Sequence, residues 1–68
     1  MMTVYEVTVT DGGDFDAVRF NALYRDMNEA WDVGEYELKK AKARYDGDDM
    51  ADTFKGQIEL SVTTRRVL

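Results

Sequence analysis

The chain has few side chains that could do chemistry, and most of them are carboxylates. No Cys and no His occur among its 68 residues, which excludes a thiol nucleophile, a thiolate zinc site and the usual general base. Paired carboxylates catalyse acid–base reactions only where burial shifts their pKa values. Here they gather in two polar segments, Asp11, Asp14 and Asp16 in one and Asp46, Asp48, Asp49 and Asp52 in the other. The sequence therefore predicts a protein that is not an enzyme and needs no cofactor.

The second acidic segment partly matches a calcium-binding loop. Such a loop has oxygen ligands at alternating positions, a Gly at its tight turn and a Glu at its end. Asp46 and Asp48 occupy the first two ligand positions, but Met50 occupies the third and no Glu closes the loop. An EF-hand is therefore excluded. Whether the two acidic segments together bind a cation stays open, and solvated turns are the simpler interpretation.

Arginines are the other group with a clear chemical use. Arg65 and Arg66 end the last alternating segment, and two further arginines precede the predicted helix. A guanidinium pairs with a carboxylate through two parallel hydrogen bonds, and arginine is frequent among the residues that dominate protein interfaces. We predict a partner-binding set of arginines and tyrosines: Arg65, Arg66, Arg19, Arg25, Tyr5 and Tyr24. The alternative is that the last two arginines are simply solvated.

Two other functions stay open. The net charge of −5 argues against direct nucleic-acid binding, which depends on Lys and Arg. An acidic surface can instead imitate nucleic-acid phosphates and block a DNA- or RNA-binding protein, and its residues would be Asp46, Asp48, Asp49 and Asp52. A chain of 68 residues also builds only a marginal core. That favours a structural homodimer formed through exposed strand edges.

Three segments alternate between apolar and polar residues, which is typical of half-buried strands. They cover residues 3–10, 18–25 and 57–67. The middle segment is ambiguous, because Phe20 and Tyr24 equally fit a longer helix that starts near residue 15. The preceding pair, Gly12 and Gly13, tolerates positive φ and predicts a hairpin with a returning strand. We therefore favour a strand there.

A helix is predicted from Met27 to about Tyr45. Asp26, with Glu29 three positions on, is typical of a reciprocal helix cap in which each carboxylate accepts from a backbone N–H. The apolar stripe of this helix comprises Met27, Ala30, Trp31, Gly34, Leu38, Ala41 and Tyr45. Gly34 costs about 1 kcal/mol of helix propensity relative to Ala. A close approach of the helix to the sheet would explain it.

The order of elements indicates the fold class. Residues 46–47 end the helix, and residues 49–54 fit a short helical turn. We predict one α+β domain over residues 1–68, with the order β-β-α-β and one helix on one face of a three-stranded antiparallel sheet. Its inward residues would be Tyr5, Val7, Val9, Val18, Phe20, Trp31, Leu38, Ile58, Leu60 and Val62. The other face, with Val4 and Leu23, would stay partly bare and available for docking.

The run Met27-Asn28-Glu29-Ala30-Trp31-Asp32-Val33-Gly34-Glu35-Tyr36, between two strands and a third, resembles the small podovirus-encoded inhibitors of host RNA polymerase. That resemblance implies a phage protein that takes part in host takeover by occupying a surface of a host protein such as the polymerase. It also implies that last-strand arginines engage an acidic surface, and the nearest counterparts are Arg65 and Arg66. The chain departs from the family by the acidic loop of residues 46–55 and by placing its arginine pair so late.

Targeting signals are not evident. No apolar run approaches the 18 or so residues of a membrane span, and the first residues lack a basic segment followed by an apolar one. We therefore expect a cytoplasmic protein, in the host cytoplasm if it is phage-encoded, with no membrane partner.

Overall fold

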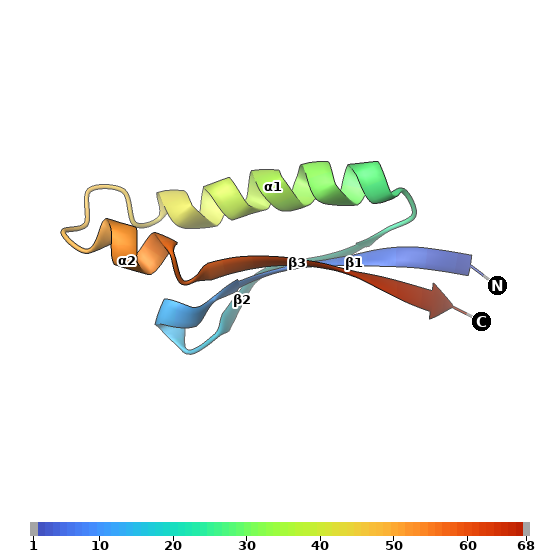
Figure 1. Cartoon of the computed structure of the whole chain (residues 1–68), viewed down its shortest axis with the longest axis horizontal. Helices are drawn as coiled ribbons and strands as arrows, with labels where there is room; N and C mark the ends of the chain where they lie inside the picture. Colours follow the sequence, from blue (N-terminus) through green and yellow to red (C-terminus); the bar gives the residue numbers. More distant parts are fainter. Residues whose placement is uncertain (1, 68) are drawn as a thin grey trace.

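The structure, a computed structural model, describes residues 2–67 and has two layers (Figure 1). A three-stranded antiparallel sheet of order β2-β1-β3 forms one layer, and helix α1 covers one of its faces. The elements are β1 (Met2–Asp11), the 3₁₀ turn η1 (Gly12–Asp14), β2 (Ala17–Tyr24), α1 (Met27–Ala43), α2 (Ala51–Lys55) and β3 (Ile58–Val67). The predicted α+β fold with the order β-β-α-β is confirmed, and the ambiguous middle segment is a strand.

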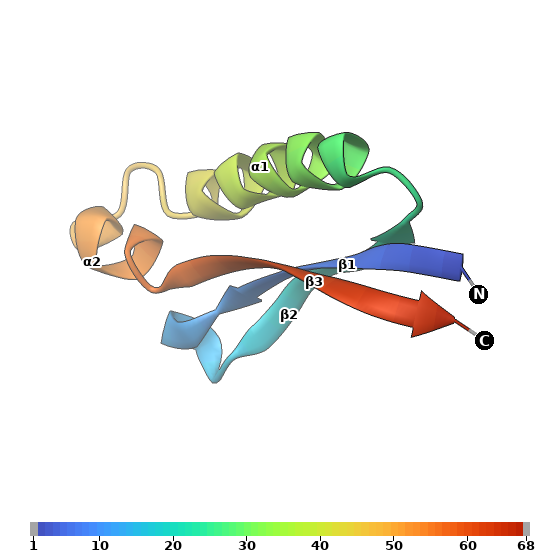
Figure 2. The same cartoon turned by 45° about the vertical axis from the view of Figure 1, so that its right-hand side comes forward.

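The two ladders on the central strand β1 differ in regularity. The β1–β3 ladder runs without a shift from Met2↔Val67 to Asp11↔Ile58. The β1–β2 ladder shifts between Val9 and Thr10, so that Arg19 is an extra, bulged residue. Figure 2 shows how β2 splays away from β3 beyond this point. One edge of the sheet is therefore regular and the other is interrupted.

The alternation of side chains along β1 determines which of its residues are buried beneath α1. Val7 and Val9 are fully buried beneath α1, and Ile58 joins them from β3. The predicted inward positions are largely confirmed, but Val18 and Trp31 are 61% and 44% exposed. Val18 precedes the bulge and is out of phase with the rest of β2, whereas Trp31 lies on a flank of the helix.

The bare face differs from the prediction at Val4. Leu23 is 60% exposed there, but Val4 is only 8% exposed. Arg65 lies directly opposite Val4 on β3. Since long side chains cover apolar cross-strand neighbours with their aliphatic stems, this position accounts for the burial of Val4.

The β1–β2 connection reverses by a different route from the predicted one. Neither Gly12 nor Gly13 has positive φ; Phe15 and Asp16 do, at 53° and 57°. The Asp11 side chain accepts a hydrogen bond of 3.0 Å from the Gly13 N–H. This cap draws the glycines into the 3₁₀ turn η1, and the left-handed residues follow it.

The predicted cap at the start of α1 forms in part: the Asp26 half is present, but the reciprocal bond from the Asp26 N–H to Glu29 is absent within residues 2–67. Asp26 caps the helix by accepting from the N–H groups of Asn28 at 2.7 Å and Glu29 at 3.4 Å. After the helix, Gly47 has a φ of 82°, a left-handed value that favours glycine. The short helical turn expected in residues 49–54 corresponds to α2.

Gly34 is the point of closest approach between helix and sheet. A Cβ atom there would lie 2.8 Å from Leu60 Cδ1 and 3.2 Å from Val7 Cγ1. Because Val7 belongs to β1 and Leu60 to β3, α1 lies over the line between these two strands. The predicted close approach is confirmed.

We expect Gly34→Val to destabilise the protein by about 1–3 kcal/mol, because the added side chain overpacks a tight contact. The control is Glu35→Val at the neighbouring exposed position, which introduces the same β-branched residue without the contact. Urea unfolding at equal protein concentration measures both variants. Equal stabilities for the two variants would contradict the packing role of Gly34.

Candidate functional site

One end of the sheet carries most of the predicted partner-binding residues. Met2, Thr3 and Val4 pair with residues 65–67 of β3, whereas pairing with β2 begins only at Tyr5↔Tyr24. The sheet is therefore two-stranded at this end and projects beyond α1, close to both marked termini in Figure 1. Arg65 and Arg66 lie on this projection.

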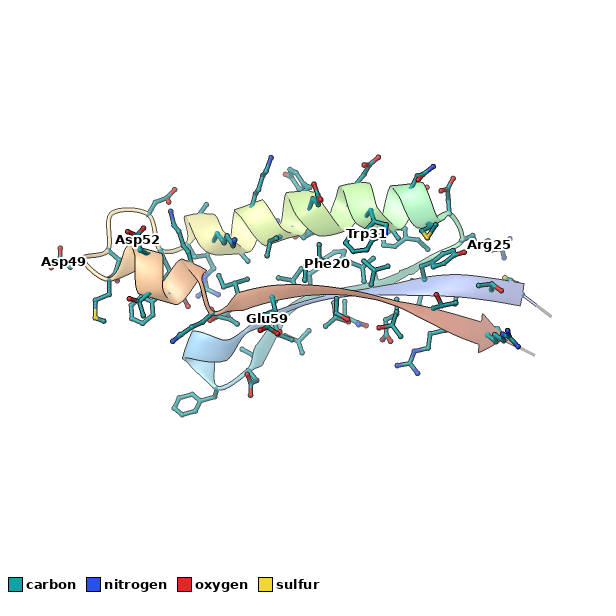
Figure 3. The ribbon with its side chains drawn as sticks, in the orientation of Figure 1. Phe20, Arg25, Trp31, Asp49, Asp52 and Glu59 are labelled. Atoms are coloured by element: carbon teal, nitrogen blue, oxygen red, sulfur yellow. The ribbon has the colours of Figure 1, made fainter. Side chains whose placement is uncertain are left out.

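The pairing of β1 with β2 brings further residues of the predicted set to the same end of the sheet. Tyr5 and Tyr24 are direct cross-strand neighbours, and Arg25 follows Tyr24 at the turn into α1. Figure 3 shows Arg25 at this end of the molecule. We call this group the arginine end; it comprises Tyr5, Tyr24, Arg25, Arg65 and Arg66.

Arg19 does not belong to it. It lies near Asp11, at the opposite end of β1 from Val4, the strand partner of Arg65. Seven residues of strand separate Asp11 from Val4, about 23 Å at the usual rise. The predicted set of four arginines is therefore divided, with three at one end and one at the other.

The two last arginines point to opposite faces of the sheet. Arg65 lies on the open face and forms an ion pair of 2.7 Å with Glu6. A hydrogen bond from Asn21, reinforced by Arg65, lowers the pKa of Glu6 below its ordinary value. Arg66, on the face of Thr3 and Tyr5, is exposed and forms no ion pair within residues 2–67. Among the described residues of the projection, Arg66 is thus a cation without an ion pair.

Exposed apolar side chains surround the arginine end. Met2 and Val67, a cross-strand pair, are 41% and 46% exposed, and Met27 at the helix start is 51% exposed. Arginine, tyrosine and methionine are the residue types enriched at the cores of protein interfaces. Composition and shape at this end thus resemble those of a docking surface.

The acidic loop lies at the far end of the molecule, where Figure 3 labels Asp49 and Asp52. Asp46 forms an ion pair of 2.5 Å with Lys55, and Asp48 accepts from the Met50 N–H at 2.8 Å. Only Asp49 and Asp52 are left without such a role within the described loop. No group of three or more carboxylates in residues 2–67 is arranged to hold a metal ion.

A buried polar cluster, which we did not predict from the sequence, lies at the end of the sheet beneath the C-terminal part of α1. Asp11 is fully buried and accepts hydrogen bonds from the Gly13 N–H, the Tyr45 hydroxyl and Arg19 Nη2. Arg19 also pairs with Asp14 at 2.5 Å. Asp11 continues the inward positions of β1, so the alternation of residues 5, 7, 9 and 11 was the signal for its burial.

Hydrogen bonding holds the Asp11 carboxylate in its charged form. The Tyr45 hydroxyl contributes most to lowering the pKa of Asp11, burial opposes it, and Arg19 and the Gly13 N–H add to the lowering. The same hydrogen bond raises the pKa of Tyr45. The Asp11 carboxylate thus joins the η1 turn, β2 and the segment after α1 through hydrogen bonds, and we call this cluster the Asp11 lock.

A shallow hollow of about 330 Å³ lies between α1 and β2 beside this cluster. Its lining residues are Val18, Arg19, Glu37, Lys40, Ala41 and Arg44. Arg19 is matched by Asp11 and Asp14, and Glu37 offsets one of the two helix cations. The hollow thus has little excess charge, and its apolar floor is small.

Comparisons with protein-family models, curated proteins and solved structures found no significant match. Within residues 2–67, neither helix combines the length and the apolar character required to cross a bilayer.

Asp11→Asn tests the lock. We expect a loss of about 1–3 kcal/mol at neutral pH, because a buried charged acceptor with three donors is removed. The folded pKa of Asp11 is lowered, so its contribution is present above the ordinary value of 3.8 and is lost as the pH falls below it. Asp11→Asn should therefore be less sensitive than wild type to acid below that pH.

Unfolding by urea at several pH values measures this difference. Asp16→Asn is the matched control, because the Asp16 side chain is exposed and takes no part in the hydrogen bonds to Asp11. A wild-type acid dependence in Asp11→Asn would show that other carboxylates carry the effect.

Proposed function

We propose that this chain is a non-enzymatic protein-binding module that docks through its arginine end on an acidic surface of a partner protein. The single observation that carries the proposal is the two-stranded projection on which Arg66 lies exposed and free of ion pairs within residues 2–67. Arg25 at the same end also forms no ion pair within residues 2–67, so two arginines there are available to a partner's carboxylates.

The surroundings of Arg66 support the same use. Tyr5 and Tyr24 lie on the same face and are half-buried, so they offer rigid contact area at a small entropic cost. Arg65 is held by Glu6 on the other face. The projection is therefore ordered by its own ladder before any partner binds, which lowers the entropic cost of docking.

The first partner to test is host RNA polymerase. The strand–strand–helix–strand order and the helix start resemble those of the podovirus inhibitors, whose last-strand arginines engage an acidic surface of the polymerase. On this proposal the chain is a phage-type inhibitor that occupies a surface of its host's enzyme. Its acidic loop is at the opposite end and takes no part in docking.

Binding to purified bacterial RNA polymerase tests the proposal. We expect Arg25→Ala/Arg66→Ala to weaken binding at least tenfold, about 1.4 kcal/mol, because interface arginines rank among the residues that contribute most to affinity. Lys39→Ala/Lys40→Ala removes the same charge from the exposed surface of α1 and should bind like wild type. Biolayer interferometry with immobilised polymerase measures all three proteins.

Equal losses of affinity for both double variants would show that binding follows net charge and would contradict docking through the arginine end. Displacement of the chain from a nucleic-acid-binding protein by DNA, steeply dependent on salt, would instead indicate the acidic mimic.

A further inference from the structure

Of the two strand edges in residues 2–67 that have no neighbouring strand, the outer edge of β3 is the more regular one. Its ladder with β1 has no shift over Ile58–Val67, and the other side of the strand is open because β3 is an edge strand. Residues 60–64 of this edge contain neither a charged residue nor Pro. Proteins usually protect such edges with charges, bulges or prolines. The opposite edge, β2, is protected by the bulge at Arg19.

We propose that a second copy of this chain occupies this edge. In the dimer, β3 pairs antiparallel with β3 of the other copy about a two-fold axis at Val62, forming one six-stranded sheet. The axis is perpendicular to the sheet, so both α1 helices lie on the same face. This proposal goes beyond the proposed function and does not depend on it.

The faces of β3 restrict the register. Ile58, Leu60 and Val62 face α1, and the residues between them face the open side. Residues directly opposite each other in an antiparallel pair lie on the same face. A symmetric dimer therefore requires paired residues whose numbers differ by an even amount, with the axis passing through one residue.

The positions of the charged residues on β3 indicate that the two-fold axis passes through Val62. Glu59 and Arg65 are each three residues from Val62, on opposite sides and both on the open face. An axis at Val62 places Glu59 of each copy opposite Arg65 of the other. Opposite charges facing each other across strands stabilise the pairing. In Figure 3, Glu59 lies on the side of the sheet away from α1, where Arg65 of the other copy would meet it.

The helix flank above β3 fits the same arrangement. At about 100° per residue, Glu37 and Trp31 lie about 60° to either side of Gly34. Glu37 lines the hollow beside β2, so Trp31 is on the β3 side, where it is 44% exposed. Since α1 lies over the line between β1 and β3, the two helices would be about two strand spacings, or about 10 Å, apart. That is the usual distance between packed helices.

The arginine ends stay apart in this dimer. Because the strands are antiparallel, the two projections point in opposite directions from the axis. Arg65 then has two carboxylate neighbours, Glu6 of its own chain and Glu59 of the other, which a forked guanidinium can accommodate. Arg25, Tyr5 and Tyr24 remain open for the partner protein.

A cysteine scan tests the edge and the register, because the chain has no Cys of its own. Cα atoms opposite each other in an antiparallel pair are about 4.5–5.5 Å apart, within disulfide range. We expect Val62→Cys to form an intermolecular disulfide under mild oxidation. Ser61→Cys and Thr63→Cys are the matched controls; each is diagonal to its own copy, about 7–8 Å away, and should link far more slowly. Non-reducing gel electrophoresis measures the rates.

Faster linkage at either control position would overturn the register, and equal slow linkage at all three would overturn the edge. Sedimentation equilibrium gives a second test. We expect wild type to dimerise, and Glu59→Arg and Arg65→Glu each to be monomeric at the same concentration, because each places like charges opposite each other. Mixing these two variants restores both opposite-charge pairs and should restore the dimer.

Asp49→Arg makes the same charge change as Glu59→Arg but lies far from β3, so it should leave the dimer intact. A wild-type chain that is monomeric up to about 1 mM, where even weak millimolar association would be visible, would overturn the proposal. So would a mixture of Glu59→Arg and Arg65→Glu that stays monomeric.

Discussion

The close contact between α1 and the sheet at Gly34 is the constraint on which the rest of the structure depends. With no Cβ between helix and sheet, α1 approaches Val7 and Leu60 closely enough to bury the centre of β1. One helix of this length can cover only one face of three strands. The open face follows from that incomplete cover, whereas the free edge of β3 follows from the strand order and the two-stranded arginine end from the later start of pairing with β2.

The two ends of the sheet use charge in different ways. At the Asp11 end, the carboxylate is buried and fully matched by hydrogen bonds from Gly13, Arg19 and Tyr45. At the other end, Arg66 is exposed with no ion pair within residues 2–67. Matched charge inside holds the fold together, whereas the free charge outside is the one that we propose pairs with a partner protein. Because the apolar core is small, the hydrogen bonds to the buried Asp11 carboxylate are important for stability.

Much of the fold was predictable because its signals are local. The cap at Asp26 and the alternation of the strands depend on neighbouring residues alone, and they indicated the helix start and the β-β-α-β order. The bulge at Arg19 was not predictable, since it appears only when β2 is paired with β1. That bulge exposes Val18 and moves Arg19 toward Asp11. The gathering of Arg25 with Arg65 and Arg66 likewise depends on register, which no local pattern specifies.

Amide hydrogen exchange followed by NMR can detect the proposed association through the uncovered edge of β3 residue by residue. From Tyr5 to Asp11, β1 has a strand on both sides, so the protection of its amides there should not depend on protein concentration. Every second amide of β3 faces the open edge. We expect these outward amides to become protected as the protein concentration rises. Fast exchange of the outward β3 amides at every concentration would contradict it.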